Sequence, residues 1–514
     1  MNLNELHSFT WSDAAYLAPE WILIALAIVL ALVDLALPKR SDRSVIGWLT
    51  LAGLLASLGV VIWRLLDMNA GAGGQPIRLL ADSYRIDDFS SMLKIVFLSA
   101  TALIVLMSLG TVKREDIPEK GEFYYLLLPA VVGAMVMASS GDLVTLFVGL
   151  ELLSITTYVL VGVRKYAVES AEAAFKYVVT GGISSALVLF GMSYLYGLTG
   201  ATNLGDIATG VQQHAGDFKA LLYVAFFMLI AGFGIKIAAA PFHVWAPDVY
   251  QGAPTPVTAF LAVVSKGAAF AILFRILYNA ATGASADNAP IGSDIFLTLL
   301  IVAAAAMIIG STAALRQRNL KRMLALSGVA NAGYLLVPLG MSFKGLHAAN
   351  FGEFIFYLTA YVLMNVGVFA VYAAVERTSG HSDLKGLAGL YYRAPWTAAA
   401  MVVFVLSLAG LPVTGGFFGK LFILLGAAQS RLYWIVAVMA GTSVITYYFY
   451  FGLVRQMFMR STTDEGDVHI PVTTGVVIWL CALLTVALGV VPSPLLDWVN
   501  AHFSVINDLF VTRS

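Results

Sequence analysis

The chain has 514 residues and a mean hydropathy of +0.85, with 60% hydrophobic and 12% charged residues, which predicts a polytopic membrane protein. Its 30 basic and 30 acidic residues give no net charge, which argues against nucleic-acid binding. The single Cys481 excludes disulfides within the chain, cysteine-ligated iron–sulfur clusters and thiol redox pairs, and no G-x-G-x-x-G or G-K-[ST] string suggests a nucleotide site. We therefore expect no redox cofactor, nucleotide or metal in this chain.

Hydropathy predicts an all-α fold with about 14 transmembrane helices. The N-terminal MNLNELHSFTWSDAAY lacks the basic flank of a cleavable signal peptide, so the first apolar segment is expected to be a permanent helix. A spanning helix needs roughly 20 mostly apolar residues. Fourteen such segments follow one another, at about 15–36, 45–66, 90–110, 123–139, 142–163, 170–197, 219–246, 255–279, 294–314, 323–341, 351–376, 396–427, 431–457 and 471–492.

Basic residues are distributed unevenly between the two sets of connectors. Those on one side contain 17 of the 30 lysines and arginines, in PKRSDR, VKREDIPEK, VRKY, RQRNLKR, ERTSGHSDLKGLAGLYYR and RQMFMR. Because Lys and Arg accumulate in cytoplasmic loops, this side is expected to face the cytoplasm. An even number of spans then places both termini on the non-cytoplasmic side of a bacterial cell membrane, although a plastid location is also compatible.

Five ionisable residues lie within the predicted spans: Glu151, Lys176, Lys236, Lys266 and Lys420. Each charge near the bilayer centre costs about 2.5–3.5 kcal/mol on insertion scales, so such residues usually face a protein interior and have partners. A single lysine can instead snorkel to the interface or connect two helices. Lys176 fits that alternative best, because it lies near a basic connector and has Glu172 four residues earlier.

Two of these lysines accompany a predicted break in their helix. In FGIKIAAAPFH, Pro241 has no backbone N–H and its ring collides with the preceding turn, so the helix is expected to be interrupted near Lys236. In LAGLPVTGGFFGKLFIL, Pro412 and three glycines loosen the helix that contains Lys420. Irregular backbone at membrane depth is tolerated only inside protein or against water, so a hydrated cavity is predicted beside each lysine.

The two breaks suggest an internal repeat, because each is preceded by an Ala-Gly pair and accompanies a lysine. The predicted domains are a three-helix segment at 1–110, a first five-helix repeat at 123–280, a second at 294–457, and a C-terminal helix and tail at 471–514. Because five is odd, the second repeat is inverted, which is the architecture of ion-coupled transporters. The broken helices should then be antiparallel, with both lysines facing the interior.

Four segments carry a family resemblance: GLELLSITTYVLVGVRKYAVESAEAAFKYVVTGGISSALVLFG, FGIKIAAAPFHVWAPDVYQGAPTPVTAFLAVVSKGAAFA, RQRNLKRMLALSGVANAGYLL and LAGLPVTGGFFGKLFIL. Across nearly the whole chain they resemble the antiporter-like (Mrp-type) membrane subunits of respiratory complex I, the proton-translocating NADH:quinone oxidoreductase. PFHVWAPDVYQGAPTPVTAFL is particularly specific. Lys420 also fits, because a sister subunit usually has a glutamate there, and the chain lacks the long lateral helix of the distal subunit.

The resemblance implies a role for each buried group. Glu151 and Lys236 would form the half of a proton channel that opens to the cytoplasm, Lys266 would connect the halves, and protons would leave from Lys420. Since a neighbouring carboxylate favours the charged form of a lysine, movement of Glu151 would switch whether Lys236 holds its proton. Quinone reduction elsewhere in the complex would drive that switching, with flavin, iron–sulfur clusters and quinone held by other subunits. Sister antiporter-like subunits would be partners, and this chain alone is expected to catalyse no redox reaction.

Asn331, in SGVANAGY, is a departure from the family pattern, because many relatives have a histidine in that helix. An amide does not titrate, so a proton path there would use water or hydroxyls such as that of Tyr334. Tyr357 and Tyr361 are further candidates to line a water path, although such aromatic residues more often serve packing. His243, beside Pro241, is a candidate proton relay or, equally, a cap for free carbonyls.

Two other functions remain open at this point. A subunit of a multisubunit Mrp-type cation/proton antiporter would share the broken helices and the buried Glu and Lys residues. Sodium coupling would normally add intramembrane carboxylates, and only Glu151, Glu20 and Asp34 are candidates. An inert scaffold that keeps the ancestral fold is the third possibility, but it would have little reason to keep four buried lysines.

Overall fold

The structure of the protein is a computed structural model that describes residues 11–38, 41–70, 76–113, 115–118, 120–281, 291–341, 349–379, 383–460 and 468–510. Helices make up almost all of it, and the two short strands form one antiparallel hairpin. In the first half of the chain the elements are α1 (Trp11–Tyr16), α2 (Ala18–Ala36), α3 (Ser44–Ala70), β1 (Ile77–Leu79), β2 (Tyr84–Ile86), α4 (Asp88–Thr111), α5 (Lys120–Ser139), α6 (Leu143–Val161), α7 (Val168–Thr199), α8 (Leu204–His214), α9 (Lys219–Lys236) and α10 (Ala246–Gly252).

The second half of the described chain begins with one long, locally irregular helix. It comprises α11 (Thr255–Phe260), the π-helical turn η2 (Leu261–Ser265), α12 (Lys266–Ile276) and a second π-helical turn, η3 (Leu277–Ala281). The remaining elements are α13 (Ile291–Ala314), α14 (Leu320–Gly340), α15 (Asn350–Ser379), the 3₁₀ turn η4 (Leu384–Leu387), α16 (Leu390–Arg393), α17 (Pro395–Ala409), α18 (Gly415–Gln429), α19 (Tyr433–Met459), α20 (Val472–Val490), α21 (Ser493–His502) and the π-helical turn η5 (Val505–Leu509).

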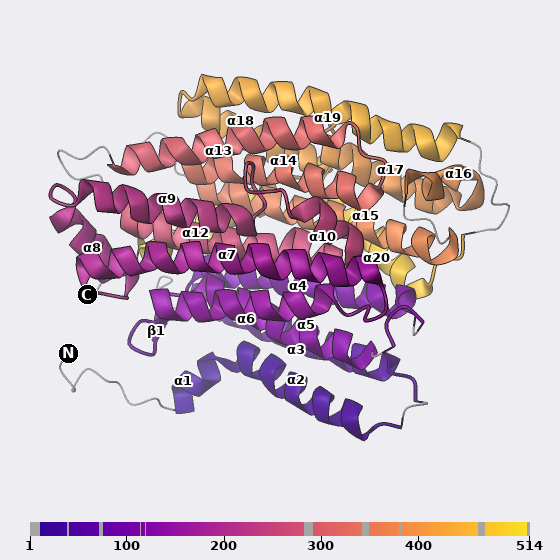
Figure 1. Ribbon diagram of the computed structural model, residues 1–514, viewed down its shortest axis with the longest axis horizontal. Coiled ribbons are helices and arrows are strands. Elements are labelled where there is room, and N and C mark those ends of the chain that lie inside the picture. The colour runs from indigo at the N-terminus through magenta and orange to yellow at the C-terminus, as the bar shows by residue number, and fades with distance from the viewer. Residues whose placement is uncertain are drawn as a thin grey trace.

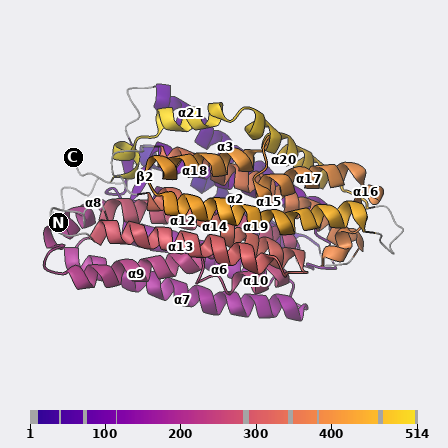
Figure 2. The same ribbon diagram turned by 90° about the horizontal axis from the view of Figure 1, so that it is seen from above.

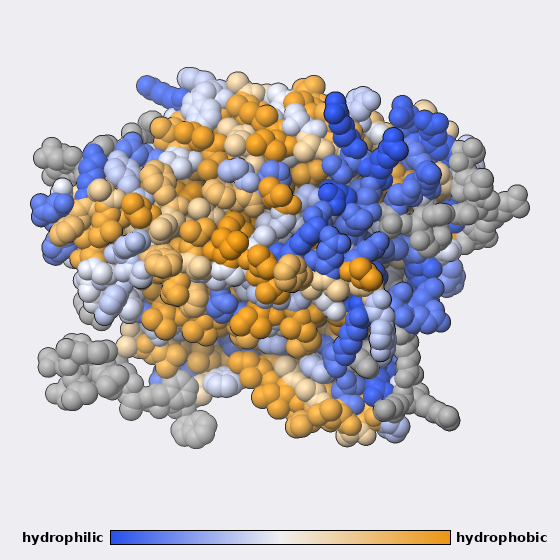
Figure 3. All heavy atoms as spheres, in the orientation of Figure 1, coloured by the Kyte–Doolittle hydropathy of each residue, from blue (hydrophilic) through white to orange (hydrophobic). Residues whose placement is uncertain are grey.

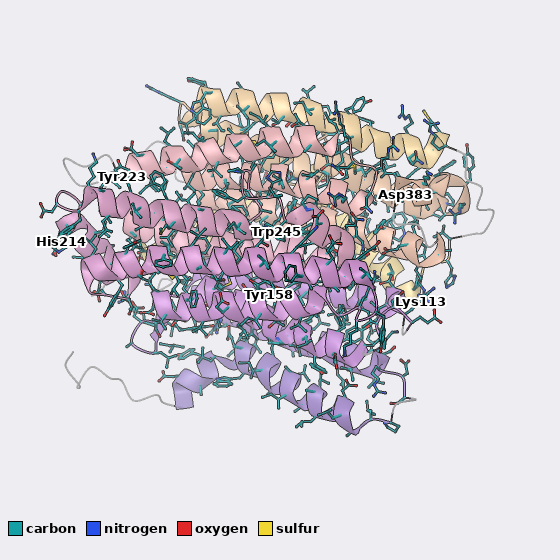
Figure 4. The ribbon with its side chains drawn as sticks, viewed as in Figure 1. Lys113, Tyr158, His214, Tyr223, Trp245 and Asp383 are labelled. Atoms are coloured by element: carbon teal, nitrogen blue, oxygen red, sulfur yellow. The ribbon has the colours of Figure 1, made fainter. Side chains whose placement is uncertain are left out.

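The long helices run side by side along the molecule (Figure 1), as the spans of a membrane bundle do. β1 and α8 lie at one end of the bundle, and α16 lies at the other. The view from above shows α7 on one flank and α21 on the opposite flank (Figure 2). Hydrophobic residues spread over the middle of the visible surface, whereas hydrophilic residues gather towards the α16 end (Figure 3). We call that end the basic face: Lys113 and Arg164 line one cavity there, and Arg318 and Lys385 lie beside Asp383, which Figure 4 labels at the same end.

The predicted set of spans is confirmed. Within the described residues, thirteen helical segments are long and apolar enough to cross a membrane, and the predicted span 396–427 is present as the two shorter apolar helices α17 and α18. The segments Thr255–Ala281, Leu320–Gly340 and Asn350–Thr378 are almost completely buried and form the centre of the bundle. All-helical spans are expected because lipid offers no partners for backbone N–H and C=O groups.

Both predicted helix breaks are present. The α9 helix ends at Lys236, and Pro241 lies in the non-helical stretch before α10. The α17 helix ends at Ala409, Gly410 adopts a left-handed conformation with φ +83°, and Pro412 lies before α18. In Figure 1 the α9–α10 pair and the α17–α18 pair run in opposite directions. Inverted repeats require this arrangement, and the repeat itself stays a prediction.

Hydropathy did not predict the short elements outside the spans. Ile77, Arg78 and Leu79 pair with Ile86, Arg85 and Tyr84 in the hairpin. The α8 helix begins at an Asn203 cap, whose side chain accepts from the Gly205 N–H at 2.9 Å. The turn η5 packs its Asp508 and Leu509 into the protein. These segments are too short or too polar to register in a search for membrane spans.

Candidate functional site

Glu151 and Lys236 lie on neighbouring helices but form no ion pair within 4.0 Å, although both belong to the described part of the chain. The Lys236 ammonium donates to the Ser154 hydroxyl at 2.7 Å and to the Tyr158 hydroxyl at 3.4 Å. Ser154 follows Glu151 by three residues on α6, so it stands on the same side of that helix. Lys236 is 8% exposed and still interacts electrostatically with Glu151. In this structure the direct hydrogen-bond partners of Lys236 are therefore hydroxyls of α6 rather than the Glu151 carboxylate.

The exposed stripe of α6 explains the position of Glu151. Val148 and Ile155, three residues before it and four after it, are more than half exposed. Glu151 lies between them and is only partly buried, and its Oε1 is enclosed without a hydrogen bond from any described residue. Glu151 thus lies at the edge of the exposed surface of the chain, on the turn of α6 that also holds Ser154.

The backbone carbonyls next to Lys236 keep hydrogen-bond donors at the first break. The Ile235 carbonyl accepts from the indole N–H of Trp245 at 2.9 Å and from a backbone N–H at 3.1 Å. Trp245 stacks on Tyr177 at 4.9 Å, and Tyr177 in turn packs edge-on against Tyr158 at 4.8 Å. Figure 4 shows Tyr158 and Trp245 in the middle of the molecule, far from both ends. His243 is half-buried, and its Nδ1 is enclosed without a partner among the described residues.

Lys266 begins α12, directly after the π-helical turn η2. Its side chain is 2% exposed, and the ammonium donates to the Gly328 carbonyl of α14 at 3.0 Å. Gly328 has no side chain to fill the space above it, where a Cβ would lie 2.8 Å from the Lys266 Nζ and 3.1 Å from the Tyr361 hydroxyl. π-Helical turns inside α-helices often mark functional positions, which agrees with the location of this lysine.

Asn331 lies one turn beyond Ser327, within a group of buried hydroxyls. Its Nδ2 donates to the Ser327 carbonyl at 2.9 Å, and its Oδ1 accepts from the Tyr357 hydroxyl at 2.5 Å. The Ser327 hydroxyl is hydrogen bonded to the hydroxyl of Tyr450. The predicted use of hydroxyls around Asn331 therefore has a geometric basis, with Tyr357 rather than Tyr334 as its direct neighbour.

Lys420 lies in α18 and is bound by backbone groups of the second break. Its ammonium donates to the Leu408 carbonyl at 2.8 Å and to the Ala409 carbonyl at 3.3 Å. It also lies 4.9 Å from the centre of the Tyr334 ring, within the range of a cation–π interaction. The Tyr334 hydroxyl points elsewhere, because it is bound to the Met439 carbonyl on α19 at 3.1 Å. Tyr334 thus contacts Lys420 through its ring.

Lys176 is more exposed than the other three candidate lysines, as expected of a lysine that snorkels to the membrane interface. Its side chain is 40% exposed, and its ammonium lies 2.7 Å from carboxylate oxygens of both Glu172 and Asp248. Arg322 binds the second oxygen of Asp248 at 2.5 Å. Burial opposes ionisation of Asp248, but hydrogen bonds from Lys176 and Arg322 hold its pKa below the usual value. These groups form a charged cluster on the basic face.

Sequence reasoning missed several other buried charges. Lys94 is fully buried and pairs with Glu20 at 2.8 Å, so Glu20 is tied to a lysine of α4. Arg275 pairs with Asp87 at 2.6 Å, and both side chains are fully buried. Asp34 binds Arg43 at 2.9 Å near the surface. The signal was available, because Lys94 and Arg275 stand inside the apolar strings SSMLKIVFL and AILFRILYN.

A further missed pair, Lys321 and Glu376, lies at the basic ends of α14 and α15, with Nζ and Oε1 3.5 Å apart. Among the described residues there is no group of three or more His, Cys, Asp or Glu side chains that could hold a metal ion. The buried polar groups of this part of the chain include carboxylates, amines and hydroxyls. Such groups hold and transfer protons.

Comparisons with known proteins identify the family. Residues 140–446 match the family model described as NADH:quinone oxidoreductase/Mrp antiporter, TM. The chain is 62% identical to NADH-quinone oxidoreductase subunit N of Paenibacillus sp. strain JDR-2, over 99% of this chain and 100% of that protein.

Two solved structures extend the comparison to three dimensions. A chain in the structure of respiratory complex I from Thermus thermophilus with bound aureothin is 31% identical, with a TM-score of 0.76 over 93% of this chain and 98% of that one. A chain of the Mrp complex from Dietzia sp. DQ12-45-1b shares the fold, with a TM-score of 0.80 over 96% and 98% of the two chains, at 20% identity.

Proposed function

The chain belongs to the NADH:quinone oxidoreductase/Mrp antiporter family, and from this premise we propose that it is a proton-translocating, N-type membrane subunit of an NADH:quinone oxidoreductase. The single observation that carries the proposed mechanism is a set of proton-holding groups within the bundle, the buried Lys236, Lys266 and Lys420 and the partly buried Glu151, with hydroxyls beside Lys236 and Asn331. The Mrp alternative has less support, because the chain is 20% identical to the Mrp chain and shares its fold, whereas it is 62% identical to the oxidoreductase relative.

In the first half of the proposed proton path, the Ser154 hydroxyl is the direct hydrogen-bond partner of the Lys236 ammonium. A hydroxyl both donates and accepts, so Ser154 accepts from the ammonium and donates to the Leu150 carbonyl at 2.6 Å. When the Glu151 carboxylate approaches, the charged lysine is favoured; when it withdraws or is neutralised, the lysine releases its proton. The absence of a direct ion pair in this structure fits the withdrawn arrangement.

Lys266 then receives the proton at the centre of the bundle and passes it towards Lys420. At Gly328 the Lys266 ammonium and the Tyr361 hydroxyl both approach the α14 backbone closely, so that hydroxyl is the nearest side-chain group for the first step. The Ser327, Asn331 and Tyr357 group continues the path. Asn331 does not titrate, so its role is to orient the Tyr357 hydroxyl rather than to carry the proton.

The basic face is proposed to be the cytoplasmic side, where Lys and Arg accumulate in membrane proteins. Protons would enter there and leave on the opposite side of a bacterial cell membrane. Other membrane subunits, including sister antiporter-like chains, would cover exposed apolar surfaces such as the Val148–Ile155 stripe around Glu151. Flavin, iron–sulfur clusters and quinone would belong to other subunits, and their redox reaction would drive the movement at Glu151.

The test is the pair Glu151→Gln and Glu151→Asp in the assembled complex. Glutamine keeps the shape and removes the charge, so we expect proton uptake per NADH in membrane vesicles to fall on the order of tenfold or more. Aspartate keeps the charge and should retain much of the activity. Native gels report complex content, and Glu172→Gln, on the surface of α7, is the control. Normal pumping by a fully assembled Glu151→Gln complex would refute this mechanism.

A further inference from the structure

A polar cavity of about 290 Å³ opens on the basic face, outside the chain of lysines described above. It lies among the basic ends of α4, α11 and α15 and the connector after α6, and Lys113 on its rim is labelled near that end of the molecule in Figure 4. We call it the vestibule. Six of its lining residues are charged: Lys113, Glu115, Asp116, Arg164, Glu376 and Arg377. Since water occupies about 30 Å³ per molecule in the liquid, several water molecules fit inside.

Glu376 connects the vestibule to a buried lysine. One carboxylate oxygen, Oε2, accepts from the Thr255 hydroxyl at 2.6 Å, and the other, Oε1, lies 3.5 Å from the Lys321 ammonium. The Glu376 side chain is 22% exposed, whereas that of Lys321 is 2% exposed. Water in the cavity can therefore reach the Glu376 carboxylate. Lys321 does not line the cavity and lies behind that carboxylate.

Lys321 belongs to α14, and Lys266 of α12 binds α14 two turns further along. Lys321 donates to the Ala253 carbonyl at 3.0 Å, and Lys266 donates to the carbonyl of Gly328, seven residues after Lys321. Seven residues are two helical turns, so these positions share a face and lie about 10 Å apart along the axis. A few water molecules in single file span such a distance.

Two hydroxyls without a hydrogen bond from any described residue lie at the Lys266 end of this path. Tyr250, three residues before Ala253, is 1% exposed, and its ring centre lies 5.9 Å from the Lys266 ammonium. The hydroxyls of Tyr250 and Tyr361 are both buried without a hydrogen bond from any described residue. A buried hydroxyl normally has a partner, and water is the partner small enough to fit between side chains. The end of the path at Lys266 is therefore polar.

We propose that Glu376 and Lys321 form a second proton-loading site, which takes protons from the vestibule and delivers them to Lys266 without passing Glu151 or Lys236. The inference rests on the proposed function. The Lys321 ammonium gives its proton to the neutral amine of Lys266 through intervening water. Glu376 then accepts a proton from vestibule water and passes it to the neutral Lys321. The net result is one proton removed from the vestibule, one gained by Lys266, and a loading site returned to its starting charge.

The competing explanation is a structural ion pair that ties α14 to α15. A double variant separates the two, because removal of both partners of a buried ion pair is often nearly neutral for stability, whereas removal of one leaves an uncompensated charge. The variants are Glu376→Gln, Glu376→Asp and the double variant Glu376→Gln/Lys321→Met, in the whole complex. The matched control is Glu122→Gln/Lys165→Met, which removes an exposed ion pair on the same face.

We expect Glu376→Gln to lower the rate of proton uptake in vesicles about three- to tenfold, and Glu376→Asp to restore most of it. The double variant should assemble normally on native gels and stay equally slow. Uptake by the slow variants should also fall more steeply than that of the control between pH 6.5 and 8, because proton arrival has become limiting. Recovery of pumping in the double variant, or a normal rate in assembled Glu376→Gln, would overturn the proposal.

A second measurement covers the case in which these variants fail to assemble. Lys113→Cys, on the rim, is assembled first and then treated on the basic face with a bulky methanethiosulfonate reagent, and vesicles without that cysteine are treated in parallel. Slower uptake only after modification supports loading through the vestibule, and an unchanged rate refutes it. Glu151→Gln is measured beside all of these: if it pumps normally, the proposed function fails; if it alone is defective, only the second loading site fails.

Discussion

The two broken helices place their lysines in different chemical surroundings. Lys236 ends the half-helix before its break, and its ammonium is held by side-chain hydroxyls of another helix, those of Ser154 and Tyr158. Lys420 follows its break, and its ammonium is held by the backbone carbonyls of Leu408 and Ala409. A hydroxyl rotates and both donates and accepts, whereas a carbonyl only accepts. The first site therefore adapts to a charged or a neutral amine, and the second consistently favours a donor.

The largest difference should come from replacing each lysine by methionine. Lys420→Met should lower pumping about tenfold or more, because protons from both loading routes leave through it, and Lys236→Met should lower pumping severalfold, because it closes the route through Glu151 alone. Only Lys420→Met should also destabilise the protein, since it leaves two buried carbonyls without their donor, at about 1–3 kcal/mol for each unsatisfied group. Thermal unfolding of the purified complex, monitored for this subunit, measures that difference.

At Lys236 the remaining hydroxyl has an alternative partner. Ser154 already donates to the Leu150 carbonyl, so Lys236→Met leaves no donor without an acceptor there. Equal losses of thermal stability in the two variants would show that the carbonyls of the second break find other donors, and the contrast between the two sites would then be wrong.

Much of this architecture was predictable from the sequence, and the partners of the lysines were not. Uninterrupted apolar strings predicted the spans, and Pro241 and Pro412 predicted the breaks, because both signals are local. Contacts between α6 and α9, such as Ser154 with Lys236, depend on how helices far apart in sequence rotate against each other. Hydropathy does not report that rotation.

Buried charges near the ends of spans were missed for a similar reason. Lys321 stands in the basic connector RQRNLKR, where a solvated lysine is the ordinary expectation. Only the packing of α14 against α15 buries it beside Glu376. Charge near the end of an apolar string is compatible with snorkelling or with burial, and tertiary structure decides between them.

Gly410→Ala should have the next largest effect and should act on the second break alone. Gly410 has φ +83°, a conformation that strains any residue with a Cβ, and that Cβ would lie 3.0 Å from the Cδ of Lys420. We expect pumping to fall roughly fivefold, because the lysine is displaced from its carbonyl acceptors. Gly441→Ala is the control, since nothing lies within 4 Å of a Cβ at that helical position. Equal activity of the two variants would mean that Lys420 tolerates displacement.

Ser154→Ala should have the smallest effect and should act on the first break alone. It removes the 2.7 Å acceptor of the Lys236 ammonium and leaves the Tyr158 hydroxyl at 3.4 Å. The loss of one hydrogen bond of about 1 kcal/mol should slow pumping roughly fivefold or less. Ser154→Thr, which keeps the hydroxyl, should restore the rate, and Ser193→Ala, whose hydroxyl bonds only within its own exposed helical turn, should leave it unchanged. If Ser154→Ala left the rate unchanged, Tyr158 and Glu151 alone would control the protonation of Lys236.

The fully buried Arg275 has a consequence for the biosynthesis of this protein. Its guanidinium donates to Asp87, which precedes it in the chain, and to the backbone carbonyl of Asp508, 233 residues later. Asn279, one turn further on, donates to the Leu509 carbonyl at 2.9 Å. During translation the first acceptor is already in place when Arg275 enters the membrane, but the second leaves the ribosome only after α20 and α21. A nascent chain that stops after α20 thus leaves this cation incompletely bound until η5 has been made.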